Sequence, residues 1–146
     1  MNCRTEEKQK IEELIDLAIR QLSFSYAPYS GFFVGAALEC ADGTIYGGCN
    51  IENAAFGPSN CAERTAFFKA VSEGKRQFRR IAIVGGKDGK ITEYCAPCGV
   101  CRQVMREFCG PDFEIILAKS KKEWNVYLLK DLLPESFGPE MLDGKK

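Results

Sequence analysis

Residues 61–66 read CAERTA and residues 97–104 read PCGVCRQV, and these two stretches decide both the fold and the chemistry of the chain. The spacing of apolar residues, with glycine stops, predicts one helix over residues 61–74 and another over residues 98–109. Each predicted helix therefore begins at a cysteine. A helix N-terminus stabilises a thiolate, because its free N–H groups and its macrodipole favour negative charge.

Three cysteines in these stretches have the spacing of metal ligands. Cys98 and Cys101 are three residues apart, so both thiols face the same side of a first helical turn. If the two helix starts face each other, Cys61 supplies a third sulfur to the same ion. Zn²⁺ accepts thiolates in tetrahedral geometry, and three protein ligands leave its fourth position open for water. Histidine is absent from the 146 residues, so metal ligands must be Cys, Asp or Glu.

Glu63 is the residue that indicates catalysis. It follows Cys61 by two residues, which places it to reach a zinc-bound water and not to ligate the ion. Zinc lowers the pKa of such a water to about 7, and a neighbouring carboxylate can accept the proton. The same carboxyl group can deliver the proton to a ring nitrogen and then to a departing amine. The pattern predicts zinc-dependent hydrolytic deamination with Glu63 as the catalytic residue.

A closed structural zinc site is an alternative, because Cys95 precedes Cys98 by three residues. Together with the three cysteines above, Cys95 could complete a non-catalytic, structural zinc module with four cysteine ligands. Pro97 argues against this alternative, since Cys95 would precede the helix and would have to turn back toward the ion. Glu63 also argues against it, because a structural site needs no carboxylate there, although a first-turn glutamate commonly stabilises a helix.

The rest of the chain alternates between helical and strand patterns. Apolar residues at helical spacing predict an amphipathic helix over residues 5–22. Asn60 ends a loop and is the expected N-cap of the helix that follows. The alternation predicts an α/β fold, a three-layer α-β-α sandwich with a mixed five-stranded sheet, in a single domain over residues 1–146. The expected strands cover residues 34–40, 44–51, 80–84, 113–118 and 125–129, before a helical turn at 131–134 and a tail from 135.

Composition narrows the class of partner. Lys and Arg total 20, as do Asp and Glu, and the formal net charge is zero. A basic stripe that would bind a phosphate backbone is not seen, so we expect a small neutral substrate and no nucleic acid. No apolar run approaches the roughly 20 residues that span a bilayer, and no signal peptide is seen. We expect no membrane association, a cytoplasmic location, and thiols at the eight cysteines, some of them metal ligands.

The two cysteine stretches resemble the cytidine deaminases of the small homotetrameric, zinc-dependent class of the cytidine/deoxycytidylate deaminase family. A cysteine at the first ligand position is typical of the enzymes that act on free nucleosides, whereas deaminases of nucleic acids generally have histidine there. The likeness extends over roughly residues 10–140. Its further matching segments are Pro28-Tyr29-Ser30, VGAAL at 34–38, GCNIENA at 48–54 and LLPESF at 132–137.

The resemblance implies an activity and an assembly. The activity is zinc-dependent hydrolysis of cytidine and deoxycytidine to uridine and deoxyuridine, with release of ammonia, in pyrimidine salvage. The family's enzymes hold one Zn²⁺ per subunit and form homotetramers. Cys61, Cys98 and Cys101 match the zinc ligands of the family, and Glu63 matches its proton carrier.

The resemblance also implies substrate-binding roles. Asn50 and Glu52 would bind the ribose 3′-hydroxyl, Phe32 would pack against the pyrimidine, and backbone near Ala54 would hold the base edge. Phe137 would reach across a subunit interface into a neighbour's pocket. The polar pair could instead be the solvated face of a strand, and the two phenylalanines could be ordinary core or interface residues.

Arg64 would donate to the zinc-bound thiolates. Three thiolates around Zn²⁺ sum to a charge of −1, which would raise the pKa of a bound water, and a guanidinium offsets that charge. A solvated surface arginine is the alternative interpretation. Phe56 stands where the family often has tyrosine, so this chain lacks the hydroxyl at that position. Two further substrates remain open at this point: a blasticidin-type nucleoside antibiotic and cytosine in a single-stranded oligonucleotide.

Overall fold

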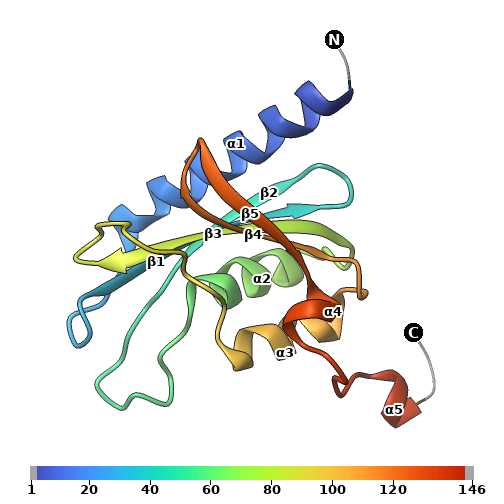
Figure 1. Ribbon diagram of the computed structural model, residues 1–146. Helices are drawn as coiled ribbons and strands as arrows, with labels where there is room; N and C mark the ends of the chain where they lie inside the picture. The colour runs from blue at the N-terminus through green and yellow to red at the C-terminus, as the bar shows by residue number, and fades with distance from the viewer. Residues whose placement is uncertain (1–2, 144–146) are drawn as a thin grey trace.

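A mixed five-stranded sheet forms the middle layer of the structure, a computed structural model that describes residues 3–143 (Figure 1). The strand order is β2-β1-β3-β4-β5, and only the β3–β4 pair is parallel among these neighbours. This arrangement confirms the predicted sheet. The strands are β1 (Phe32–Cys40), β2 (Ile45–Cys49), β3 (Phe78–Lys87), β4 (Glu114–Ser120) and β5 (Glu123–Leu128).

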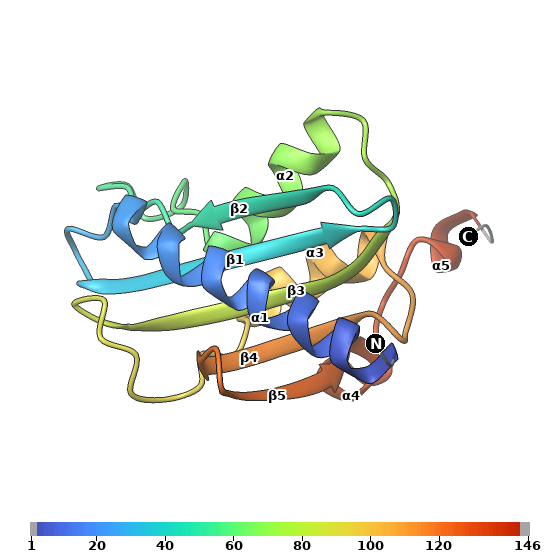
Figure 2. The same ribbon diagram turned by 90° about the horizontal axis from the view of Figure 1, so that it is seen from above.

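Helices cover both faces of the sheet, as the alternation predicts. Helix α1 (Cys3–Gln21), continued by the 3-10 turn η1 (Leu22–Phe24), lies across the face that Figure 2 shows toward the viewer. Helices α2 (Ala62–Ser72) and α3 (Gly99–Phe108) lie behind the sheet in that view. Two short helices follow near the C-terminus, α4 (Leu129–Leu132) and α5 (Glu140–Asp143). The result is a three-layer α-β-α sandwich.

Two hydrophobic cores hold the layers together, one on each face of the sheet. Leu38 and Ile83 pack into the core under α2 and α3, whereas Ala37 and Val84 pack into the core under α1. This division follows from the alternation of side chains along a strand. The central strands are apolar on both faces because both faces are covered.

The observed elements differ from the predicted ones mainly at their ends. Strand β3 continues through residues 85–87, beyond its expected end at residue 84, because Phe32 pairs with Lys87 at the end of the β1–β3 ladder. Helix α4 begins at Leu129, predicted as the end of a strand, and that side chain is fully buried. Helix α5 lies in the predicted tail. Within residues 3–143, no helix combines the length and apolar character needed to cross a bilayer.

The N-cap prediction at Asn60 is wrong. Cys61 occupies that position, and the Asn60 side chain instead donates from Nδ2 to Thr65 Oγ1 over 3.2 Å. Gly48 on β2 explains how the start of α2 lies so close to the sheet. A Cβ atom at Gly48 would lie 2.5 Å from the Ala62 carbonyl oxygen, so only glycine lets the helix begin there.

Candidate active site

Two cysteines occupy the N-cap positions of two neighbouring helices. Cys61 precedes α2 with φ −75° and ψ 157°, and Cys98 precedes α3 with φ −68° and ψ 165°. Neither side chain makes a capping hydrogen bond to its own helix, so both thiols are available to a ligand. Cys101 lies in the first turn of α3 and is buried. The fold therefore brings the three predicted ligands together.

The geometry of the three sulfurs fits zinc. Their Sγ atoms all lie within 4.8 Å of one another. Two sulfurs bonded about 2.3 Å from a tetrahedral zinc ion lie about 3.8 Å apart, and the Cys61 and Cys98 sulfurs are separated by 3.8 Å. A donor set of three thiols is also one that Zn²⁺ prefers.

Cys95 is not a member of this group of sulfurs. Its thiol packs against β3, since a Cβ atom at Gly85 would lie 2.9 Å from Cys95 Sγ. Burial raises the pKa of the Cys95 thiol to about 12, but the pKa of Cys101 is raised as well, so it is the position outside the sulfur group that distinguishes Cys95. All eight cysteines are free thiols in this structure. The arrangement favours three sulfur ligands and an open fourth position over a closed site of four cysteines.

Glu63 lies in the first turn of α2 and is 4% exposed. Burial raises the pKa of its carboxyl group to about 7, and the charge on Cys61 acts in the same direction. A carboxyl group with a pKa near neutrality can both take up and release a proton under working conditions. This is the property that the predicted acid–base role requires.

Arg64 contacts the sulfur cluster directly. Its Nη2 donates to Cys61 Sγ over 3.3 Å. Hydrogen bonding from the Cys101 thiol, then from Arg64 and Cys98, lowers the pKa of Cys61 to about 5. The same contact raises the pKa of Cys101, whose thiol donates to Cys61. The cluster thus favours one thiolate without a metal, and an ion would displace the remaining thiol protons.

One cavity of about 320 Å³ joins the sulfur cluster to the predicted sugar-binding residues. Its lining includes Glu63, Arg64 and two of the cluster's cysteines, which we call the metal end, and also Asn50 and Glu52, which we call the sugar end. Its lining comprises Ser30, Phe32, Val34, Asn50, Glu52, Ser59, Asn60, Cys61, Glu63, Arg64, Cys95, Ala96 and Cys98. Seven predicted site residues therefore face one space, from four separate segments of the chain.

Asn50 is held by the backbone of β1. Its Oδ1 accepts from the Val34 N–H over 2.9 Å, and its Nδ2 donates to the Phe32 carbonyl over 2.7 Å. The side-chain amide thus continues the pairing of β1 beyond the end of β2. A carboxamide nitrogen carries two hydrogens. One N–H of Asn50 therefore remains for a ligand.

Glu52 accepts hydrogen bonds from the turn that precedes β1. Its Oε1 accepts from the N–H groups of Tyr29 (2.9 Å) and Ser30 (3.1 Å), and its Oε2 accepts from the Ser30 hydroxyl. These donors, the Ser30 hydroxyl first, lower the pKa of Glu52. An ionised carboxylate offers about four acceptor positions. Three are occupied, which leaves one for a ligand.

Two predicted substrate-binding residues lie outside the lining of this cavity. Ala54 is exposed on the loop after β2. Phe137 is 55% exposed beyond α4, where its carbonyl accepts from Gln103 Nε2 over 2.9 Å. Phe56 is also exposed, and its ring meets Tyr29 edge-on with centroids 6.0 Å apart.

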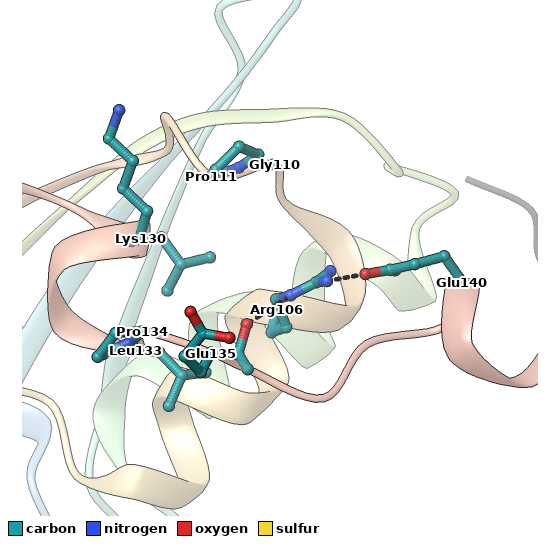
Figure 3. Close-up of a pocket in the computed structure, with 10 residues that line it drawn as sticks. Arg106, Gly110, Pro111, Lys130, Leu133, Pro134, Glu135 and Glu140 are labelled. Atoms are coloured by element: carbon teal, nitrogen blue, oxygen red, sulfur yellow. Dashed lines mark hydrogen bonds and ion pairs between the residues drawn. The ribbon is translucent and has the colours of Figure 1, made fainter.

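A second cavity, of about 400 Å³, lies between α3, α4 and α5 (Figure 3). It contains none of the predicted site residues. Its cation Arg106 is already paired with Glu140 and donates from Nε to Ser136 Oγ over 2.8 Å. Lys130 and Glu135 also line the space, as Figure 3 shows. The charges in this second cavity include both signs, and the sulfur cluster lies outside it. The first cavity is therefore the candidate active site.

Three polar residues that line the cavity, Ser30, Ser59 and Asn60, were not among the predicted site residues, and Asn60 was expected only as a helix N-cap. Ser30 belongs to the sequence Pro-Tyr-Ser-Gly, which predicts a turn but does not indicate which residue the Ser30 hydroxyl contacts. That partner, Glu52, is 22 residues away along the chain.

Comparison with known proteins gives consistent results. The family model described as cytidine and deoxycytidylate deaminase zinc-binding region matches residues 8–117. A cytidine deaminase of Sporosarcina psychrophila is 47% identical over 132 residues, covering 90% of this chain and 94% of that protein. One from Halalkalibacterium halodurans is 45% identical over 127 residues, covering 87% and 93% respectively. The crystal structure of cytidine deaminase from Burkholderia pseudomallei aligns with a TM-score of 0.78 at 46% identity, covering 86% of this chain and 97% of that chain.

Proposed function

The chain belongs to the cytidine and deoxycytidylate deaminase family of hydrolytic enzymes, and from this premise we propose that it converts cytidine and deoxycytidine to uridine and deoxyuridine with release of ammonia. The observation that carries the proposal is the single cavity that joins Glu63 and the sulfur cluster to Asn50 and Glu52. The cavity pairs a hydrolytic group with groups that recognise a hydroxyl.

Cys61, Cys98 and Cys101 would hold the zinc ion, one per subunit. When bound there, zinc supplies Lewis-acid activation of water at neutral pH. Arg64 offsets the negative charge of the three thiolates through its contact with Cys61.

Glu63 moves the protons of the reaction. Its carboxylate accepts a proton from the attacking water, and the carboxylic acid then donates it to N3 of cytosine as oxygen bonds to C4. A second transfer through Glu63 protonates the amino group, the C4–N bond breaks, and ammonia leaves. Water and cytidine thus give uridine and ammonia without an oxidant or reductant. Its burial and its pKa of about 7 suit a group that takes up and releases protons in turn.

Asn50 and Glu52 bind and orient the sugar. A hydroxyl group donates one hydrogen bond and accepts others. The free N–H of Asn50 and the remaining acceptor position of Glu52 complement such a group. Phe32, which also lines the cavity, would pack against the pyrimidine ring.

The remaining parts of the proposal rest on the family resemblance. Backbone near Ala54 would hold the base edge, and Phe137 would enter the pocket of a neighbouring subunit in a homotetramer. A role in pyrimidine salvage would follow from that activity, whereas the cytosolic location and the single domain stay predictions from the sequence.

The test is an assay of ammonia release from cytidine by the zinc-loaded protein and by Glu63→Gln. We expect the variant to retain zinc and to lose at least roughly a hundredfold in kcat, since the proton carrier is removed. Glu73→Gln, just past the end of the same helix and outside the cavity, is the matched control and should retain activity. Near-normal turnover by Glu63→Gln would overturn the proposal. Blasticidin S and a single-stranded oligonucleotide, assayed in parallel, test the two other substrate classes.

A further inference from the structure

A single turn before β1 presents hydrogen-bond donors to Glu52. The Gly31 N–H donates to the Ala27 carbonyl over 2.9 Å, which closes the chain into one turn. Inside this turn, the N–H groups of Tyr29 and Ser30 point to Glu52 Oε1. The turn thus acts on the carboxylate as the first turn of a helix acts on an anion.

The Ser30 hydroxyl makes the third contact with Glu52. It donates to Oε2, while its oxygen accepts from the Phe32 N–H over 3.0 Å. Because a hydroxyl carries one hydrogen, the bond from Phe32 fixes the direction in which Ser30 can donate. Ser30 therefore links two residues that face the substrate, the carboxylate of Glu52 and the backbone of Phe32.

The position of Ser30 is itself fixed from β3. Lys87 Nζ donates to the Ser30 carbonyl, and the Asp88 N–H donates to the Gly31 carbonyl over 2.7 Å. Gly31 has φ +66°, and a Cβ atom there would lie 2.8 Å from Lys87 Nζ. Glycine at this place both permits the backbone conformation and leaves room for the lysine.

We propose that Ser30 is a positioning residue for sugar recognition, which fixes Glu52 so that its one remaining acceptor position faces the 3′-hydroxyl of the nucleoside. The inference rests on the proposed function and deepens it. Three donors occupy three of the four acceptor positions of Glu52, two on Oε1 and one on Oε2. With the Ser30 hydroxyl in place, Oε2 keeps one free acceptor position, and the carboxylate is held in one orientation. Without the Ser30 hydroxyl, Oε2 loses its only donor within residues 3–143, and the carboxylate is held through Oε1 alone, which leaves the direction of Oε2 less fixed.

The test compares Ser30→Ala with wild type on two substrates, cytidine and 3′-deoxycytidine. A hydrogen bond to a charged group that positions a ligand is worth roughly a tenfold change in binding. We therefore expect KM for cytidine to rise roughly tenfold in Ser30→Ala, with kcat altered less than about twofold. KM for 3′-deoxycytidine should stay unchanged, because this nucleoside lacks the 3′-hydroxyl that would donate a hydrogen bond to Glu52. Ser30→Thr, which retains a hydroxyl, should restore most of the loss.

Two further variants separate positioning from a general structural effect. Ser23→Ala, an exposed serine whose hydroxyl bonds to the Arg20 carbonyl, is the matched control and should not change either KM. In the background of Glu52→Gln, the Ser30→Ala substitution should add little, because residues that act through one another are not additive.

The outcomes separate this inference from the proposed function. Absence of cytidine turnover by zinc-loaded wild type would overturn the proposed function, and the inference with it. Normal wild-type turnover with an unchanged cytidine KM in Ser30→Ala would overturn the inference alone. An equal loss on both nucleosides would also overturn it, since that result indicates a structural effect without selectivity for the 3′-hydroxyl.

Discussion

At the metal end of the cavity, three cysteine sulfurs crowd within 4.8 Å of one another with one guanidinium beside them. At the sugar end, the two oxygens of Glu52 accept from two backbone N–H groups and one hydroxyl of the same chain. The metal end is complete only when an ion replaces the thiol protons. At the sugar end, by contrast, hydrogen bonds within the chain already fix the orientation of the Glu52 carboxylate.

This difference teaches how each end should respond to substitution. A metal site depends on its full set of ligands, so loss of one ligand removes the function as a whole. A hydrogen-bonded recognition site loses its contacts one at a time, and each loss is graded. Substitutions at the two ends should therefore differ in the size of their effects.

The largest effect should come from the metal end, with Cys98→Ser. We expect this variant to lose stoichiometric zinc and at least about a thousandfold in cytidine turnover, because only two thiolates remain. Elemental analysis of dialysed protein and the ammonia assay measure both quantities.

Cys95→Ser is the matched control for that variant. It also replaces a cysteine of the cavity wall, but a half-buried one outside the sulfur cluster. It should retain its zinc. Loss of zinc from Cys95→Ser would restore the closed four-cysteine alternative and contradict the contrast between the two ends.

A graded loss should follow at the sugar end, from Glu52→Gln. The variant loses a charged acceptor for the substrate hydroxyl, which is worth about a 10- to 100-fold decrease in kcat/KM for cytidine. Its zinc content should equal that of wild type. A concurrent loss of zinc would show that the two ends are not independent.

Glu52 also gives a pH dependence with a definite sign. Its pKa lies below the ordinary value of 4.5 because the Ser30 hydroxyl and the two N–H groups stabilise the charged form. A lowered folded-state pKa contributes stability above the ordinary pKa, and that contribution is lost as the pH falls through the folded-state value. The difference in melting temperature between wild type and Glu52→Gln should therefore be constant from about pH 6 to 8 and narrow below about pH 4.5. A difference that widens on acidification would contradict the proposed hydrogen bonding.

Arg64→Gln tests whether the metal end has a graded component. Arg64 donates to Cys61 but is not a ligand, and substitutions of residues that support a ligand cost about 10- to 100-fold in affinity or activity. We expect roughly a tenfold decrease in kcat with zinc retained at saturating metal. A competitive chelator titration would show the weaker binding, and unchanged zinc affinity together with unchanged kcat would assign Arg64 to the surface.

Much of the metal end could be predicted from sequence because its determinants are local. Cys61 and Cys98 start two helices, and Cys101 and Glu63 lie within the first turns, so helical periodicity alone places them. The α-β-α sandwich could also be predicted from local pattern, because helical and strand segments alternate along the chain and the strands are apolar. Whether the two helix starts face each other required the tertiary fold.

The sugar end could not be derived from local pattern. Ser30 and Glu52 meet across 22 residues only because β1 and β2 pair in one register, and a register is not visible in single residues. The resemblance supplied Asn50 and Glu52, but it did not identify the turn that directs them. Lys87 lies beyond the expected strand over residues 80–84, at the end of the observed β3, where pairing with β1 brings it to Ser30.

The smallest effect should come from Lys87→Met, at the periphery of the sugar end. Lys87 donates to the Ser30 carbonyl, and its charge helps to lower the pKa of Glu52. Its side chain is exposed, so solvent and salt screen much of its influence. We expect KM for cytidine to rise only about twofold to threefold, and the difference from wild type to shrink as the ionic strength is raised from about 0.01 to 1 M. Lys90→Met, an exposed lysine in the neighbouring turn, should leave KM unchanged. If Lys87→Met matched the loss in Glu52→Gln, the sugar end would depend on a single charge and not on graded hydrogen bonding, and its contrast with the metal end would fail.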